Sequence, residues 1–249
     1  MKSASTSIAV GVLLAVLLAL PLGLPAAEAP DAARRQEVET IVREYLRAHP
    51  EVIVEALQEM ERREQEAQRR HRAEAVRAHL TELTQDPGSP VGGNPQGAVT
   101  VVEFFDYQCG YCKRVALEIK KLLQADSDVR LVYRELPILG PPSVFAARAA
   151  LAAHRQGKYE PLHAALMGTN ERLTEQKVLQ LASQVGVDAA QLEKDMADPA
   201  VAAALDRNFE LQRKLNIQGT PALVIGTEFI PGAADLATLM KLVEQARRK

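Results

Sequence analysis

The chain has 249 residues, of which 47% are apolar, and a formal net charge of −2. This composition suits one sizeable globular domain with an appendage, or two modest domains. The near-neutral charge, the absence of a long basic tract and the absence of Trp exclude nucleic acid as a partner, because nucleic-acid binding needs clustered cations and stacking rings.

Residues 1–27 are predicted to be a signal peptide that is removed on export. Lys2 supplies the positive start, and residues 8–20 form the apolar run of such peptides. The run is shorter than the roughly 20 apolar residues of a membrane-spanning helix, which favours a cleaved peptide over a membrane anchor. Cleavage after any of three small residues fits the sequence: Ala26, Ala27 or Ala29.

Residues 28–86 are predicted to be a helical oligomerisation segment followed by a linker helix. The block is rich in Arg and Glu and contains neither Lys nor Gly, a composition that favours solvated helix. Pro50 separates two apolar stripes at helical spacing, which consist of Val38, Ile41, Val42, Tyr45 and Leu46, then Ile53, Ala56, Leu57 and Met60. Residues 61–72 contain one apolar residue, Ala67, and i,i+4 charge pairs, and a last stripe covers residues 73–83.

The two stripes before residue 61 need a partner surface, because two short amphipathic helices cannot bury both stripes by themselves. One alternative is that the segment folds as a cap on the rest of its own chain. The other is that it associates with further copies of itself. The solvated stretch 61–72 favours association, because it separates the stripes from the rest of the chain. We therefore expect a homo-oligomer that forms through residues 31–60.

A second domain is predicted over residues 87–249, beginning at a loop over residues 87–97 that is rich in Gly and Pro. Its first strand is one apolar run, which indicates burial on both faces, and a helix then crosses over to a parallel strand. In chain order we expect strands over Val99–Phe105 and Val129–Tyr133 with a helix from residue 109 between them, an all-helical stretch over about 138–217, strands over Ala222–Ile225 and Glu228–Ile230, and a helix over 234–247. This order predicts an α/β thioredoxin-like fold with an inserted helical domain.

Cys109 and Cys112 are the only cysteines of the chain. A bridge between them closes a ring too small to add much stability. A zinc site would need two further ligands with suitable spacing, and the five scattered His residues offer no second motif. We therefore interpret the pair as a redox-active dithiol, with no metal ion and no cofactor beyond the Cys109–Cys112 disulfide itself.

The position of the motif predicts that the two cysteines are unequal. Cys109 lies where a strand turns into a helix, and the free amides at a helix start favour an anion, so its thiolate is expected to be the nucleophile. Cys112 lies one turn into the helix, where it is expected to be shielded and less acidic. Cys109 would attack a disulfide, and Cys112 would resolve the mixed disulfide that forms.

Two groups of motifs resemble known families. Residues 104–113 (FFDYQCGYCK) and 219–222 (GTPA) resemble the periplasmic DsbA/DsbC/DsbG superfamily, over residues 88–249. Residues 41–46 (IVREYL) and 49–52 (HPEV) resemble the N-terminal trimerisation segment of ScsC-type suppressor-of-copper-sensitivity proteins. The resemblance implies a periplasmic thiol–disulfide oxidoreductase that forms a homotrimer.

The resemblance also implies roles for residues around the dithiol. Thr220 and Pro221 match a cis-proline turn that binds substrate beside the first cysteine, whereas the alternative is a trans proline at the start of a strand. Gly110 and Tyr111 match the DsbC-type isomerase motif and are expected to contact substrate. Glu103 matches a buried acid that assists proton transfer, whereas the alternative is a charge that faces outward at the strand end.

The Cys-Gly-Tyr-Cys motif leaves three functions open. The resemblance favours a disulfide isomerase or reductase that acts on exported proteins with cysteines and is kept reduced by a membrane protein of the DsbD or ScsB type. The first alternative is a DsbA-like disulfide oxidase with a DsbB-type partner. The second is a copper-binding or copper-tolerance protein, because paired thiolates bind Cu(I).

Overall fold

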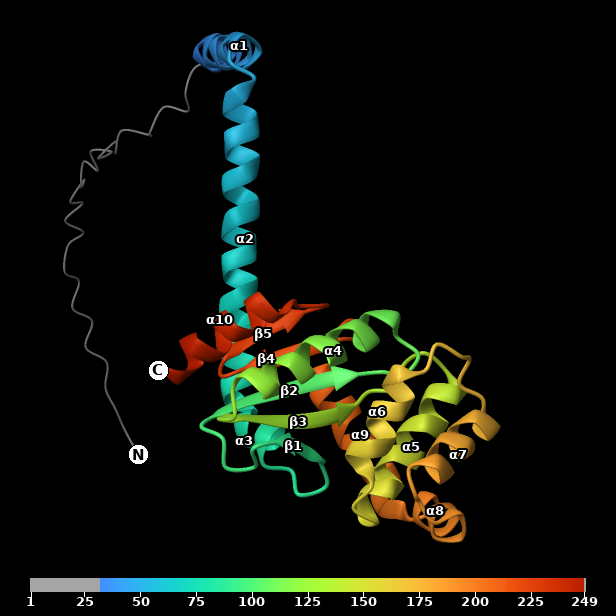
Figure 1. Cartoon of the computed structure of the whole chain (residues 1–249). Coiled ribbons are helices and arrows are strands. Elements are labelled where there is room, and N and C mark those ends of the chain that lie inside the picture. The colour runs from blue at the N-terminus through green and yellow to red at the C-terminus, as the bar shows by residue number, and fades with distance from the viewer. Residues whose placement is uncertain (1–31, 249) are drawn as a thin grey trace, which may run out of the picture. The chain divides into compact units, whose positions relative to one another are not determined.

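The computed structural model of the protein describes residues 32–248, and the predicted signal peptide over residues 1–27 lies outside them (Figure 1). None of the described helices is long and apolar enough to cross a lipid bilayer. The chain divides into two compact units, Met1–Met60 and Glu61–Lys249, and each has its own organisation.

The described part of the first unit is helical on both sides of Pro50. Helix α1 spans Ala32–Ala48, and helix α2 spans Glu51–Ala78 and so continues into the second unit. No residue of α1 is buried. Leu46 of the first predicted stripe is partly buried. The other large apolar side chains of both stripes are about half exposed, and these are Val38, Ile41, Val42, Tyr45, Ile53, Leu57 and Met60. The helices therefore form where the periodicity predicts them, and the single chain leaves their apolar faces open.

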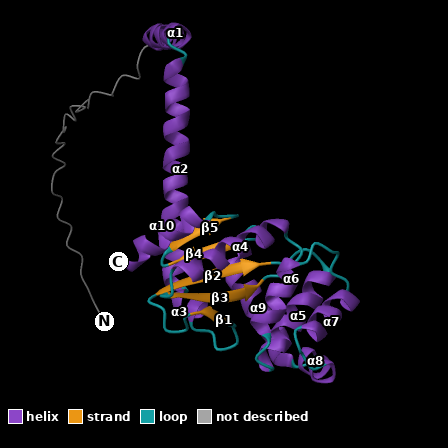
Figure 2. Cartoon of the chain, viewed as in Figure 1, coloured by secondary structure: helices purple, strands orange, loops and turns teal. Residues whose placement is uncertain are grey.

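The second unit is built on one five-stranded sheet in the order β1-β3-β2-β4-β5 (Figure 2). Strands β2 and β3 are parallel, as the crossover through α4 (Gly110–Ala125) predicts, and the other neighbours are antiparallel. The five strands span Val91–Gly93, Val99–Phe105, Val129–Glu135, Ala222–Ile225 and Glu228–Pro231. The four predicted strands are confirmed.

Strand β1 lies in the stretch 87–97 that the composition predicts to be a loop, and this prediction is wrong. Its three residues include two glycines and have no alternating pattern, yet they pair with β3 at an edge of the sheet. Glycine is favoured at Gly93, whose φ is +64° and where a Cβ would come within 2.6 Å of the Val129 carbonyl oxygen.

Side chains of β2 alternate between two cores. Val101 and Phe105 join the larger core, which includes residues of α4 and of α10 (Leu236–Arg247). Val102 and Phe104 join the smaller core on the other face, together with Val76, Leu83, Val132, Leu211 and Val224. The prediction of a strand buried on both faces is therefore confirmed.

The predicted all-helical stretch consists of helices α5 to α9, and α5 to α8 gather beyond one end of the sheet (Figure 1). Buried alanines run along α5, so its neighbours can approach closely. Helices α7, α8 and α9 begin after Thr174, Asp188 and Asp198, whose side chains accept backbone N–H groups of the first turn. The five helices span Pro141–Arg155, Tyr159–Gly168, Glu175–Gln184, Ala189–Met196 and Pro199–Lys214.

The chain around residue 86, where composition places the end of the linker helix, lies within the second unit. Val76 of α2 and Leu83 of α3 (Leu80–Thr84) are wholly buried in the smaller core with Val102 and Phe104. The Gly- and Pro-rich loop after Asp86 therefore does not separate two independently packed units. The last turns of the linker therefore form part of the core beneath the sheet.

A buried arginine fixes this part of the linker. Arg134 of β3 is wholly buried, and its guanidinium donates to Asp86 Oδ2 at 2.8 Å, to the Leu83 carbonyl at 2.8 Å and to the Glu82 carbonyl. The two carbonyls belong to the last turn of α3, which has no helical partners for them. Arg134 thus caps the C-terminal end of α3 and also forms an ion pair with Asp86.

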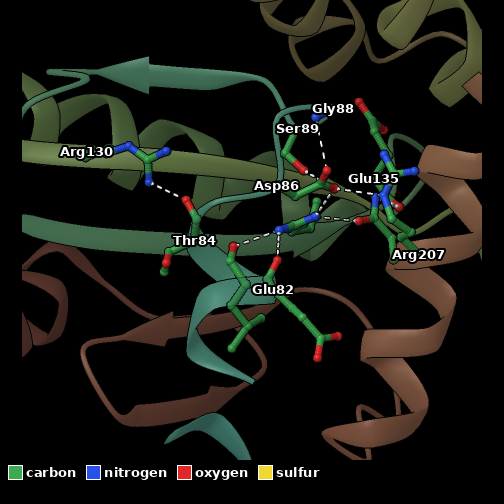
Figure 3. Close-up of polar contacts among 11 residues, drawn as sticks. Glu82, Thr84, Asp86, Gly88, Ser89, Arg130, Glu135 and Arg207 are labelled. Atoms are coloured by element: carbon green, nitrogen blue, oxygen red, sulfur yellow. Dashed lines mark hydrogen bonds and ion pairs between the residues drawn. The ribbon is translucent and has the colours of Figure 1, made fainter. Parts of the chain in front are cut away.

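Asp86 is held in turn by several donors (Figure 3). The Gly88 amide donates to Oδ1 at 3.0 Å, and Arg207 Nε donates to Oδ2 at 3.2 Å. Burial alone would raise the pKa of Asp86, but these donors together with Arg134 hold that pKa below its ordinary value. Asp86 is therefore the ionised partner of a buried ion pair.

Replacing Arg134 by Met is expected to destabilise the protein by about 3 kcal/mol, because Asp86 and two α3 carbonyls lose their buried donor. Arg130→Met is the matched control, since Arg130 lies on the same strand, is only partly buried and donates to one carbonyl, that of Thr84, at 2.8 Å. Urea denaturation of both variants measures the two losses. Equal losses would contradict the anchoring role of Arg134.

Candidate active site

Cys109 lies at the N-cap of helix α4, directly after the turn that follows β2. Its amide donates to the Asp106 carbonyl at 3.0 Å, and its own carbonyl accepts the Lys113 amide at 3.1 Å. The residue is 9% exposed, so its side chain is mostly buried but reaches the protein surface. The predicted strand, turn and helix around the motif are confirmed.

Cys112 lies one turn further along α4 and is wholly buried. Burial raises the pKa of the Cys112 thiol far above its ordinary value, and the neighbouring Cys109 raises it further. Hydrogen bonding by the Asp106 backbone and by the Thr220 side chain lowers the pKa of Cys112, but the effect of burial is larger. The prediction of a shielded, less acidic Cys112 is therefore confirmed, and the role of Cys109 as the attacking thiolate stays a prediction.

The Thr220–Pro221 peptide bond is cis, so this prediction is confirmed and the alternative of a trans proline is wrong. Pro221 directly precedes β4, and Cys109 Sγ donates to the Thr220 carbonyl oxygen at 3.3 Å. The chain therefore brings a backbone carbonyl from 111 residues away against the outer sulfur. A peptide that reacts at Cys109 would lie beside this carbonyl.

Gly110 and Tyr111, between the cysteines, face away from the core. A Cβ on Gly110 would meet no atom within 4 Å, and the Tyr111 side chain is exposed with the Arg114 guanidinium over its ring at 4.3 Å. Both residues are thus available to a bound peptide. Their contact with substrate stays a prediction.

Glu103 is buried in the middle of β2, at a position paired with Tyr133 on one side and Leu223 on the other. The alternative of an outward-facing charge is therefore wrong. Its Oε1 atom has no hydrogen-bond partner in the described part of the chain, and burial raises the pKa of Glu103 to about 8. A carboxyl group with this pKa can give up or take a proton near neutral pH, and its part in proton transfer stays a prediction.

A cavity of about 730 Å³ lies beside α4 and α6 and reaches Glu103. Its walls include Leu117, Leu123 and Met167, and Lys113 and Lys120 lie along it. The volume is in the range of small-molecule sites. Sequence reasoning did not predict this cavity, because its two walls come from helices whose contact depends on the inserted domain.

A second buried acid, Glu135 at the end of β3, was also missed. Tyr107 and Tyr159 donate to its Oε1 atom at 2.7 and 2.8 Å, and the Tyr107 hydroxyl also lies 3.1 Å from His163 Nδ1. Burial raises the pKa of Glu135 well above its ordinary value and lowers the pKa of His163 to about 3. An acid inside a strand, as in Glu103, was the signal that could have found it.

Within residues 32–248, no three His, Cys, Asp or Glu side chains lie together in a way that would hold a metal ion. An outer thiol on a helix start, an inner buried thiol and a cis proline opposite them, on a sheet of this order, define the class of thioredoxin-fold thiol–disulfide oxidoreductases.

Comparison with known proteins agrees with this class. Residues 100–244 match the DSBA-like thioredoxin domain, and residues 35–67 match the copper resistance protein ScsC N-terminal domain. The chain belongs to the DsbA-like thiol–disulfide oxidoreductase family and carries an ScsC-type N-terminal region.

Two solved structures and one curated relative illustrate the likeness. A thioredoxin-like oxidoreductase from Silicibacter pomeroyi DSS-3 is 50% identical, and the match covers 68% of this chain and 98% of that chain with a TM-score of 0.67. BcfH from Salmonella enterica Typhimurium is 30% identical, with 86% and 96% covered and a TM-score of 0.74. The Na(+)/H(+) antiporter NhaA 3 from Salinispora tropica is 28% identical over 158 residues, which are 63% of this chain and 24% of the antiporter. The chain thus spans about a quarter of the length of that antiporter.

Proposed function

We propose that the protein is an exported enzyme of thiol–disulfide exchange that acts as a disulfide isomerase or reductase in the periplasm. The observation that carries this proposal is the contact of Cys109 Sγ with the Thr220 carbonyl, with Cys112 buried behind it. A client peptide in extended form would lie along Thr220 and present its disulfide to Cys109. The predicted export signal supports the periplasm as the compartment.

The exchange begins when the Cys109 thiolate attacks one sulfur of a client disulfide. The client S–S bond breaks, one client thiolate leaves and a mixed disulfide with Cys109 forms. In a reduction, Cys112 gives up its proton and attacks Cys109 Sγ, so that the second client thiol leaves. The client has then gained two electrons, and the enzyme holds the Cys109–Cys112 disulfide. In an isomerisation, a client thiolate attacks the mixed disulfide instead, and no net electron transfer occurs.

Glu103 is proposed as the base that accepts the Cys112 proton. The burial that raises the pKa of the Cys112 thiol makes unassisted ionisation costly, so a nearby buried acceptor would speed the resolving step. Glu103 has the raised pKa that such a group needs. Gly110 and Tyr111 are proposed to flank the bound peptide.

The N-terminal segment is proposed to join three chains into a homotrimer through residues 31–60. The support is the exposed apolar stripe of α1 and the first turns of α2, together with the ScsC-type match over residues 35–67. Several dithiols in one assembly could act on one scrambled client. A membrane protein of the DsbD or ScsB type is the proposed electron donor.

Refolding of scrambled ribonuclease tests this function. The protein is expected to restore ribonuclease activity, Cys109→Ser to abolish that effect, and Cys112→Ser to accumulate the mixed disulfide, because only the resolving thiol is missing. Fast oxidation of reduced peptides without repair of scrambled ribonuclease would favour the DsbA-like oxidase instead. Tight Cu(I) binding that Cys109→Ser removes, without exchange activity, would favour the copper-binding alternative.

A further inference from the structure

Asp106 is a buried carboxylate in the turn between β2 and Cys109 that the exchange mechanism above does not use. Its Oδ1 atom accepts the Gln108 amide at 2.8 Å and the Ser143 hydroxyl at 2.7 Å. Its Oδ2 atom accepts the Leu139 amide at 3.0 Å. The Asp106 side chain therefore joins the turn of the dithiol to residues more than 30 positions away.

The backbone of the same residue contacts both cysteines. The Asp106 carbonyl accepts the Cys109 amide at 3.0 Å, and its backbone hydrogen-bonds the Cys112 sulfur. The position of one residue thus affects both ends of the dithiol. Because this turn sets where Cys109 Sγ lies beside the Thr220 carbonyl oxygen, 3.3 Å away, a small rotation of the turn would displace the reacting sulfur.

The distant partners of Asp106 form a rigid support. Ser143 is buried in the first turn of α5, and its hydroxyl accepts Gln108 Nε2 at 3.0 Å in addition to donating to Asp106. Leu139 lies in the loop that leads into α5. The turn before Cys109 is therefore held by side chains against the start of the inserted helical domain, and no charged side chain takes part besides Asp106 itself.

We propose that Asp106 is a positioning residue for thiol–disulfide exchange, and that its carboxylate clamps the turn of Cys109 to Leu139 and to Ser143 at the start of α5. This inference rests on the proposed exchange chemistry at Cys109. It adds that the inserted helical domain, through this clamp, sets the position of Cys109 Sγ beside the Thr220 carbonyl.

Two variants separate the loss of a clamp contact from the loss of the Asp106 charge. Asp106→Asn keeps an oxygen for Gln108 and Ser143 but places an amide donor against the Leu139 N–H. The rate constant of the folded variant with a small aromatic disulfide is expected to fall about tenfold, as is typical when a reacting group is slightly displaced. Ser143→Ala removes one clamp contact without a change of charge, and its rate is expected to fall about threefold. The double variant is expected to be no slower than Asp106→Asn alone, because both changes release the same clamp.

A redox equilibrium with glutathione provides a readout that mere loss of stability would not change. In Ser143→Ala the equilibrium is expected to move about threefold toward the Cys109–Cys112 disulfide, because the reduced form loses part of the support that holds the Cys109 thiol against the Thr220 carbonyl. Asp126→Asn is the matched control. Asp126 caps the other end of α4, and its side chain accepts the Asp128 amide at 3.0 Å in the same local geometry.

The result expected is a change of rate and equilibrium in the Asp106 and Ser143 variants and none in Asp126→Asn. Rates of folded Asp106→Asn and Ser143→Ala that both stay within about twofold of the wild type would overturn the proposal. If Asp106→Asn does not fold, Ser143→Ala decides alone. Failure of the wild type to repair scrambled ribonuclease would count against the proposed function and not against the clamp, because the small disulfide reports on Cys109 directly.

Discussion

A chain that begins at Pro87 is expected to lose its native fold, whereas a chain that begins at Glu61 is expected to keep it. The shorter chain lacks Val76 and Leu83, which are wholly buried in the smaller core, and each contributes about 2–3 kcal/mol through burial. It also leaves Arg134 without Asp86 and without the α3 carbonyls, a loss of about 3–5 kcal/mol. The sum approaches the whole stability of a typical domain, about 5–15 kcal/mol.

Circular dichroism on both chains and on the full mature protein measures their unfolding, and light scattering measures their mass in solution. The chain from Glu61 is expected to unfold cooperatively and to be monomeric, because it lacks the exposed stripes of α1 and of the first turns of α2. The full mature protein is expected to have three times the mass of its own single chain if the proposed trimer forms. A chain from Pro87 with an unchanged unfolding midpoint would contradict the anchoring of the linker, and a monomeric full protein would contradict the trimer.

Replacing Glu103 by Gln is expected to remove a large pH dependence from the stability of the protein. The pKa of Glu103 is about 8 in the folded chain, against an ordinary value of 4.5. Well below pH 4.5, Glu103 is protonated in both the folded and the unfolded chain, so its ionisation does not lower the free energy of unfolding. As the pH rises to 8 the unfolded chain ionises first, so the free energy of unfolding falls, by as much as about 5 kcal/mol for a shift of this size.

The difference in unfolding free energy between Glu103→Gln and the wild type, measured at pH 4 and again at pH 8, isolates this effect. Gln has no proton to lose, so the variant is expected to gain relative to the wild type as the pH rises. Glu193→Gln on the exposed face of α8 is the control and is expected to leave the profile unchanged. Parallel pH profiles for the wild type and Glu103→Gln would show that Glu103 ionises normally.

The sequence was sufficient for the elements whose signals are local. The apolar run of β2, the helix that opens at Cys109 and the paired strands after Pro221 all follow from short-range patterns, and the structure confirms them. The cis bond at Pro221 depended on the family resemblance, because an isolated Thr-Pro pair is ordinarily trans. The unequal burial of the two cysteines followed from the helical position of the motif.

The features that the sequence did not predict depend on contacts between distant residues. Arg134 is one of three charged residues of β3, and its burial is explained by distant partners, at 82–86 and at Asn208. Asp106 is visible in the motif, but its clamp needs Leu139 and Ser143 to return to the same place. The boundary placed at residue 86 followed composition, which reports where a loop lies and not which side chains pack beneath the sheet.

The cluster around Glu135 has an optical consequence. The chain contains five Tyr and no Trp, and three of these tyrosines, Tyr107, Tyr133 and Tyr159, pack around the His163 ring with centroid distances of 4.7–5.7 Å. Tyr107 is two residues from Cys109. The intrinsic fluorescence of the protein is therefore tyrosine emission that comes in large part from the interior next to the dithiol, so the state of this core can be followed without a label.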